Sequence, residues 1–362
     1  YHTANPPNKT LTAGIDHVVM AFAKTTLFNS ATLGDYVPFE DISTVRSRFD
    51  ENTKLMIAIG GWGDTAGFSE GAATNESRRL FAKNVVALCD KFGFDGVDLD
   101  WEYPGGNGQD YKQVPNSKKT SEIETFPLLL AEVRRALGSN RLLSIASPGK
   151  IGDMIAYRPE NAMSIWKSVD WVNVMTYDLM NRRNDVTVHH TDVKGSLETI
   201  DYYINTLHLD VAKINLGIAM YAKYFIVDSS KPCQTGLGCA TVQMESADGT
   251  DLGKSGAVTF EAQNWRHSDD FKEEPGQNGN IVYPDIILRM GTTDEAAGGQ
   301  YYYDRERSKF WTWDTPKLIE RKFSEIISAR GLGGVMVWSL CQDSLDFSHI
   351  ATIQKSIPKF NI

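Results

Sequence analysis

Residues 94–102 of the chain read Phe94-Asp95-Gly96-Val97-Asp98-Leu99-Asp100-Trp101-Glu102. The run has the apolar content of a buried β-strand, and side chains alternate between the two faces of a strand. Asp98, Asp100 and Glu102 are therefore expected on one face. Carboxylates this close repel one another and resist burial, so we expect their pKa values to separate. Carboxylates with separated pKa values are suited to acid–base catalysis.

Two other interpretations of this acidic run are less favourable. A solvated edge strand could carry three acids, but the neighbouring apolar residues favour burial. Calcium and magnesium also prefer oxygen ligands, but their sites usually lie on loops that supply backbone carbonyls. The run therefore favours catalysis, and we expect neither a metal nor a cofactor.

Short apolar runs alternate with amphipathic helical stretches along most of the chain. Such alternation predicts parallel strands with crossover helices, and continuous apolar strands indicate burial on both faces. The expected strands are residues 15–23, 54–60, 94–101, 142–147, 171–176, 213–220 and 334–339, with helices such as 75–91 and 121–137. With a first strand that ends at Tyr1, they predict an α/β fold, the (β/α)8 TIM barrel. An open doubly wound sheet is the alternative, but no GxGxxG motif follows the first strand.

The alternation stops between residues 224 and 304, which are rich in Gly, Thr, Asp and Gln. A long segment of this kind inside a barrel is usually an inserted domain or a functional loop. We therefore expect a small α+β insertion domain at 224–304, after strand 7, and a catalytic barrel formed by 1–223 and 305–362. Cys233 and Cys239 flank a glycine-containing turn and are candidates for a disulfide. Cys89 and Cys341 are expected to be buried thiols.

Aromatic and acidic residues cluster where the expected strands end. The active sites of such barrels lie at the carboxyl ends of the strands. Flat aromatic rings suit pyranose rings, and carboxylates suit their chemistry, so this clustering favours a sugar site. The residues concerned are Phe22, Trp62, Tyr103, Tyr177, Asp178, Tyr221 and Trp338, and Met175 lies at the end of the strand that precedes Tyr177.

The charge of the chain narrows the choice of partner. A net charge of −9 over 362 residues argues against nucleic acid, whose phosphates would be repelled. No apolar run has the length of a membrane span, so we expect no membrane partner. The chain starts at Tyr1 rather than at Met, for which a cleaved secretion signal is one explanation. Two glycosylation triplets, at Asn8 and Asn75, support secretion weakly. We expect a secreted, extracellular monomer.

The acidic run also matches the motif DxxDxDxE at Asp95, Asp98, Asp100 and Glu102. It resembles the catalytic strand of the family 18 glycoside hydrolases, the chitinases. Residues 58–62 are similar to the SxGG strand of that family, with Ala58 where serine is usual, which puts one supporting hydrogen bond in doubt. Further similarities are residues 175–178 to MxYD, 216–223 to GxPxYGR with Lys223 in place of arginine, and 335–338 to the closing strand.

The resemblance implies a retaining, substrate-assisted hydrolysis of β-1,4-linked N-acetylglucosamine, with chitin and chitooligosaccharides as substrates. Family 18 is an exception to the two-carboxylate scheme of most glycosidases. Glu102 would be the general acid, and the acetamido oxygen of the substrate would attack C1. Asp100 would hold the acetamido N–H, Tyr177 would donate to its carbonyl, and Asp98 would share a proton with Asp100. The implied substrate-binding residues are Trp338, Asp178, Met175, Tyr221, Phe22, Trp62, Tyr103 and Lys223.

Other functions on the same scaffold stay open. An endo-β-N-acetylglucosaminidase would share the fold and the acids, although a large insertion suits a long polymer better. A non-catalytic chitin-binding lectin usually lacks the acid, whereas Glu102 is present. Residues 67–71 match the GxSxG nucleophile elbow, but no strand leads directly into them. His189 and His190 lack the spacing of a metal site, so we interpret them as an ordinary loop pair.

Overall fold

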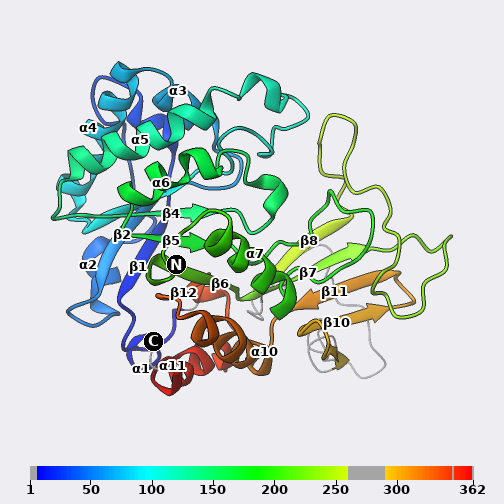
Figure 1. Ribbon diagram of the computed structural model, residues 1–362. Coiled ribbons are helices and arrows are strands. Elements are labelled where there is room, and N and C mark those ends of the chain that lie inside the picture. Colours follow the sequence, from blue (N-terminus) through cyan, green and yellow to red (C-terminus); the bar gives the residue numbers. More distant parts are fainter. Residues whose placement is uncertain (1–5, 260–289, 345, 361–362) are drawn as a thin grey trace. The chain divides into compact units, whose positions relative to one another are not determined.

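The computed structural model of the protein describes residues 6–259, 290–344 and 346–360 (Figure 1). The chain divides into two compact units. The first comprises the chain up to Met175 together with Thr199–Leu216 and Gly331–Met336. The second comprises Thr176–Glu198, Gly217–Arg330 and the residues from Val337 onward. The strand expected to end at Tyr1 lies outside the described residues.

The first unit is built on a seven-stranded sheet whose strand order follows the chain. Neighbouring strands from β1 to β6 pair in parallel. The strands are β1 His17–Ala23, β2 Lys54–Gly60, β3 Gly96–Asp100, β4 Leu142–Ser147, β5 Trp171–Val174, β6 Ile214–Ala219 and β12 Gly334–Trp338. The last residues of β6 and β12 belong to the second unit. A doubly wound sheet reverses its strand order at a switch point, and this order does not reverse, so that alternative is excluded.

Helices connect the strands, as the alternation of the sequence predicts. They are α1 Lys9–Thr12, α2 Ile42–Ser47, α3 Ala66–Ala72, α4 Asn75–Phe92, α5 Glu122–Leu137, α6 Pro159–Ser168 and α7 Val193–Asn205, with short 3-10 turns at Thr25–Phe28, Asn116–Lys118, Ile151–Asp153 and Val211–Lys213. The helices predicted at 75–91 and 121–137 are confirmed as α4 and α5, which lie side by side in Figure 1. A capping box between Thr74 and Ser77 starts α4, and Gly93, with φ at 70°, ends it.

Two aspartates fix the starts of neighbouring strands in the parallel sheet. Asp95 Oδ2 accepts the backbone N–H of Leu55 at 2.8 Å and pairs with Arg46 at 3.0 Å. Asp170 Oδ2 accepts the backbone N–H of Leu143 at 2.8 Å and pairs with Arg134. Each carboxylate thus satisfies an amide on the strand next to its own. Asp95, the first acid of the motif, has this role at the end of β3 remote from Glu102.

The second unit contains a five-stranded antiparallel sheet of order β8-β7-β11-β10-β9 (Figure 1). Its strands are β7 Tyr221–Ile226, β8 Ser255–Thr259, β9 Thr292–Asp294, β10 Gly299–Asp304 and β11 Lys309–Trp313, and its helices are α10 Pro316–Lys322, the π-helix Phe323–Ser328, the 3-10 turn Leu340–Gln342 and α11 Ser348–Phe360. The insertion expected at 224–304 contributes strands to this sheet. The sheet extends past both expected bounds, since β7 starts at Tyr221 and β11 ends at Trp313. Residues 260–289 of that insertion lie outside the described residues.

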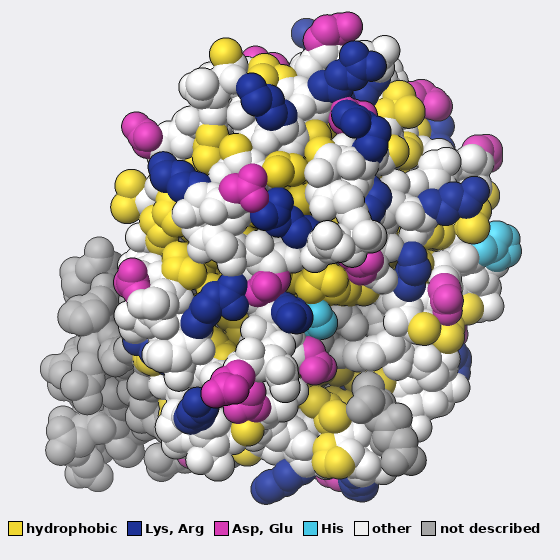
Figure 2. Space-filling view, turned by 90° about the vertical axis from the view of Figure 1, so that its left-hand side faces the viewer, with side chains coloured by type: hydrophobic (Ala, Val, Ile, Leu, Met, Phe, Trp, Pro, Cys, Tyr) yellow, Lys and Arg dark blue, Asp and Glu magenta, His cyan; other side chains and the backbone are white. Residues whose placement is uncertain are grey.

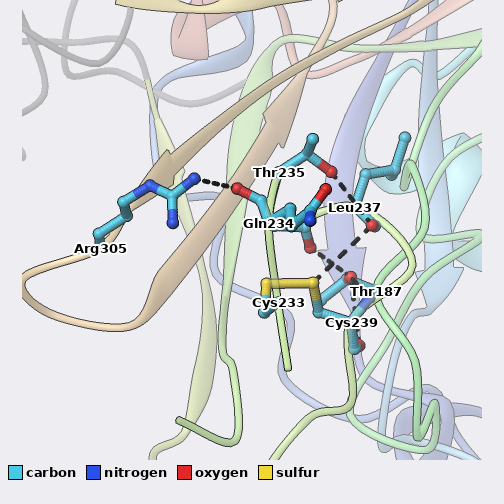
Figure 3. Close-up of a disulfide and its surroundings, with 8 residues drawn as sticks. Thr187, Cys233, Gln234, Thr235, Leu237, Cys239 and Arg305 are labelled. Atoms are coloured by element: carbon cyan, nitrogen blue, oxygen red, sulfur yellow. Dashed lines mark hydrogen bonds between the residues drawn. A yellow bond between two sulfur atoms is a disulfide. The ribbon is translucent and has the colours of Figure 1, made fainter. Parts of the chain in front are cut away.

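The disulfide predicted between Cys233 and Cys239 is confirmed, with a Cα–Cα distance of 5.4 Å (Figure 3). Thr187 holds the loop from one side. Its backbone N–H donates to the Cys239 carbonyl at 2.9 Å, and its Oγ1 accepts the Cys239 N–H at 2.9 Å. Arg305, in the turn between β10 and β11, donates a hydrogen bond to the Gln234 carbonyl (Figure 3). Elsewhere, Cys89 is a buried free thiol whose pKa is raised by burial to about 12, and Cys341 is also buried.

Candidate active site

The three acids expected to catalyse lie on β3 and directly after it. Asp98 and Asp100 belong to β3, and Glu102 follows two residues after its end. All three are nearly buried, with exposed fractions of 4%, 6% and 9%. Strand alternation turns them to one face, while Val97, Leu99 and Trp101 are packed in the apolar core. The acids therefore sit in a weakly polarisable setting where electrostatic effects on proton binding are large.

Asp98 is held by polar side chains from the strands on one side of it. The sheet register places Ala58 of β2 and Ser144 of β4 next to it. Ser144 Oγ donates to Asp98 Oδ1, and Asn173 Nδ2 of β5 donates to the same oxygen at 2.9 Å. Burial raises the pKa of Asp98 to about 6, although these two hydrogen bonds oppose the increase. The hydrogen bond left in doubt by Ala58 is thus supplied from β4 and β5.

Asp100 lies next along the same face. Burial, then the carboxylates of Glu102 and Asp98, raise the pKa of Asp100 well above its usual range. Asp100 Oδ1 is buried and has no hydrogen-bond donor among the described residues. A buried acceptor without a donor is costly in a folded protein. Asp100 Oδ1 is therefore suited to accept an N–H or O–H from a bound ligand.

Replacing Asp98 by asparagine should stabilise the protein in a pH-dependent way. The folded state binds the Asp98 proton more tightly than the unfolded state, so stability falls as pH rises from about 4 through about 6. A shift of about two units corresponds to about 3 kcal/mol, which Asp98→Asn should recover at pH 8 and not at pH 4. Urea unfolding of both proteins at the two pH values measures this. If the two proteins differed in free energy of unfolding by the same amount at pH 4 and at pH 8, the prediction would be wrong.

Aromatic residues of the first unit lie close to the ends of β1, β2 and β3. Trp62 is 48% exposed, and its ring packs edge-on against Tyr103 at 6.3 Å. A Cβ at Gly61 would lie 3.0 Å from the Phe22 ring, and φ there is 91°, so both the spacing and the backbone favour glycine at this position. Met175 follows β5 and donates its backbone N–H to Ser147 at 3.0 Å. The structure thus brings Phe22, Trp62 and Tyr103 together around the Gly61 backbone.

The second unit brings together another group of the expected residues, centred on Asp178. Tyr221 donates its hydroxyl to Asp178 Oδ1 at 2.9 Å, and Lys223 Nζ lies 3.0 Å from the same oxygen. Asp178 is half-buried, and this partial desolvation opposes its ionisation, but Lys223 and then His190 outweigh it and hold the pKa of Asp178 below its usual range. Tyr177 packs edge-on against Tyr221 at 6.1 Å. In the same unit, the half-buried Trp338 accepts the Met220 N–H at its carbonyl.

The histidine pair is more closely built into the second unit than the loop interpretation implied. His190 is fully buried, its Nδ1 lies 3.7 Å from Asp178 Oδ1, and its ring lies 5.4 Å from that of Tyr221. His189 pairs with Asp294 at 3.2 Å. In residues 6–259, 290–344 and 346–360, no group of three or more His, Cys, Asp or Glu side chains is arranged to hold a metal ion.

The GxSxG match is accounted for by a structural contact. Ser69 lies inside α3 rather than on a turn between strand and helix, as an elbow would require. Its hydroxyl donates to Glu122 Oε1 at 2.6 Å, and Glu122 Oε2 accepts the Gly105 N–H at 2.9 Å. Ser69 and Glu122 therefore anchor the loop that follows Glu102.

Comparison with known proteins identifies the family. The sequence profile described as Glycosyl hydrolases family 18 matches residues 1–343. The chain belongs to glycosyl hydrolase family 18. Among curated relatives of this family 18 chain, Chitinase A1 of Niallia circulans is 30% identical over 319 residues, which are 81% of this chain and 41% of the relative. Endochitinase 1 of Metarhizium robertsii is 26% identical over 305 residues, 81% of this chain and 62% of the relative. The family 18 chain thus spans about half of these two relatives.

Solved structures agree on the fold of the family 18 chain. A chitinase of Rhizomucor miehei superposes with a TM-score of 0.71 at 21% identity, covering 94% of each chain. Catalytic domain 2 of the Group II chitinase of Ostrinia furnacalis gives 0.71 at 23% identity, covering 98% of this chain and 90% of that one. With the sequential parallel strands and the antiparallel sheet, this likeness shows the expected (β/α)8 barrel with an insertion.

Proposed function

We propose that the chain is a chitinase that hydrolyses β-1,4-linked N-acetylglucosamine polymers with retention of configuration. The observation that carries the proposal is the buried row of Asp98, Asp100 and Glu102, in which Asp100 presents an acceptor without a donor among the described residues. The names of the curated relatives support the substrate class. So does the Ostrinia furnacalis domain, which was solved in complex with (NAG)5.

In the proposed reaction, Glu102 protonates the glycosidic oxygen while the acetamido oxygen of the same sugar attacks C1. The C1–O bond to the leaving sugar breaks, and an oxazolinium ion forms. Asp100 accepts the acetamido N–H and offsets the developing positive charge, and Tyr177 donates to the acetamido oxygen. Glu102 then removes a proton from water as the water oxygen attacks C1, the bond from C1 to the acetamido oxygen breaks, and the oxazolinium ring opens to restore the acetamido group. The nucleophile is attached to the substrate, so no translational entropy is lost in bringing it to C1.

A product time course tests the proposed function directly. N-acetylglucosamine oligomers and colloidal chitin should be cut, with oligomers of defined length accumulating first. Release of sugar from an N-glycan core in preference to chitin would instead support an endo-β-N-acetylglucosaminidase. Oligomer binding without any turnover would support a lectin, and would overturn the assignment of an enzyme.

The substrate-assisted route predicts the anomer of the first product. Two displacements at C1, first by the acetamido oxygen and then by water, return the β configuration. Proton NMR at early times should therefore show the β anomer before mutarotation. A thiazoline analogue of the oxazolinium ion should also inhibit competitively. An initial α product would rule out retention.

We further propose that Trp338, Asp178, Tyr221, Lys223, Met175, Phe22, Trp62 and Tyr103 bind the sugar chain. A neutral polymer is compatible with the surface, since lysine and arginine are interspersed with aspartate and glutamate on the face shown in Figure 2.

None of the described helices is long and apolar enough to cross a lipid bilayer. The disulfide supports an oxidising, extracellular location. Light scattering tests the proposed monomer, and detection in culture medium tests secretion.

A further inference from the structure

A chain of polar side chains, buried except for the half-buried Asn215, crosses four neighbouring strands of the first unit and ends on Asp98. Asn215 Nδ2 on β6 donates to Asn173 Oδ1 on β5 at 3.1 Å, and Asn173 Nδ2 donates to Asp98 Oδ1 on β3 at 2.9 Å. Ser144 Oγ on β4 donates to the same Asp98 oxygen. The register aligns Asn215 with Asn173. Ser144 and Asn173 are buried, so the two hydrogen bonds that they donate to Asp98 are sheltered from water.

The donors and acceptors in this chain of hydrogen bonds, called the relay below, follow from the chemistry of the amide group. An amide NH2 can only donate and an amide oxygen can only accept. Because Asn215 donates to Asn173 Oδ1, the Asn173 amide must turn its NH2 toward Asp98. Gly334 leaves room for Asn215 in this orientation, since a Cβ there would lie 2.8 Å from Asn215 Oδ1. With the Asn173 NH2 donating to Asp98 Oδ1, Asn173 Oδ1 is left as an acceptor, and Asn215 satisfies it.

The two donors reach Asp98 from one side only. Ser144 is the register partner of Asp98 on β4, whereas the partner on β2 is Ala58, whose methyl group cannot donate. Both hydrogen bonds end on Oδ1, and they occupy the two lone pairs of that oxygen. A proton on Oδ1 would displace one donor and leave it buried without a partner, which costs about 1–3 kcal/mol.

We infer that Ser144, Asn173 and Asn215 are positioning residues that keep Oδ1 of Asp98 as an acceptor, so that the proton of Asp98 is carried on Oδ2. The inference rests on the proposed function for its catalytic meaning. A proton on Oδ2 can be gained or lost without breaking either hydrogen bond of the relay. Asp98 can therefore change its charge during turnover while its carboxylate plane stays fixed.

The test removes each donor and follows the titration of Asp98. Ser144→Ala and Asn173→Leu should each raise the pKa of Asp98 by about one unit, the equivalent of a hydrogen bond to a charged group. Asn215→Leu should give a smaller rise, because it acts only through Asn173. Ser144→Thr keeps the hydroxyl and should titrate like the unaltered protein. The readout is NMR of carboxyl-labelled aspartate, with the signal assigned by Asp98→Asn, alongside the pH profile of kcat.

Asn84→Leu is the matched control, because Asn84 is a buried asparagine of α4 that donates to the carbonyls of Phe28 and Ser30. It should lower stability without moving the Asp98 titration. If Ser144→Ala and Asn173→Leu behave like this control, the inference is wrong. Ser144→Ala, the smaller change, decides the matter if Asn173→Leu does not fold. If the variants shift the Asp98 titration as expected but the unaltered protein does not cut chitooligosaccharides, the inference stands and the proposed function is wrong.

Discussion

Replacing Glu102 by glutamine should lower kcat on chitooligosaccharides by at least about 10²–10⁴-fold, the usual contribution of a general acid. Glutamine preserves the shape of the side chain but has no acidic proton to give to the leaving oxygen. The interactions that bind the sugar chain are not removed, so the dissociation constant of an oligomer should change little. Steady-state kinetics and calorimetric titration with the same oligomer measure the two quantities.

Glu124→Gln is the matched control for this experiment. Glu124 lies in the first turn of α5 and is exposed. Its replacement makes the same chemical change on the surface, and kcat should stay within about twofold, because surface substitutions usually have small effects. Near-normal turnover by Glu102→Gln would remove Glu102 from the role of acid.

Replacing Asp100 by asparagine should lower kcat by about 10²–10³-fold, the scale of losing one group that stabilises transition-state charge. The carboxylate is proposed to accept the acetamido N–H and to offset the positive charge of the oxazolinium ion. Asparagine carries no charge, and its NH2 can face the acetamido N–H, where it repels rather than accepts. The effect should appear mainly in kcat, because most of the charge develops after binding.

Asp95→Asn is the control for Asp100, since both acids belong to the same motif. Asp95 accepts the Leu55 N–H and pairs with Arg46. We expect its replacement to lower stability by about 1–2 kcal/mol and to leave kcat nearly unchanged. Equal losses of kcat in the two variants would mean that the motif acts through folding rather than through chemistry.

The strands and the longer helices could be predicted because their patterns are local. The strand at 54–60 is recovered as β2, and α4 and α5 begin within one residue of their predicted starts. The disulfide was predictable from the short spacing of Cys233 and Cys239. The insertion was harder to delimit, because no turn residue separates the strand predicted at 213–220 from Tyr221 and Ala222. In the structure the chain divides here, with β6 ending at Ala219 and β7 starting at Tyr221.

The supports of the acids could not be predicted, because they depend on register. Ser144 and Asn173 interrupt apolar strands, and a polar residue inside such a strand was the available signal. The sequence does not show which neighbour a polar side chain will face. The position of His190 beside Asp178 could not be predicted for the same reason. Its place beside Asp178 arises from a contact between residues twelve positions apart within a loop, for which the chain has no periodic pattern.

The hydrogen bond from the Leu55 amide to Asp95 has a consequence for the redesign of this scaffold. A slip of one residue in a strand turns every side chain to the opposite face. Such a slip in β3 would exchange Asp98 and Asp100 for Val97 and Leu99. Asp95 opposes this by binding the Leu55 amide of β2 at the remote end of the strand. A design that transfers the acidic strand into another barrel should therefore also transfer Asp95 and its contact with the β2 amide. The orientation of the carboxylates depends on this contact, which lies at the opposite end of the strand from the catalytic acid.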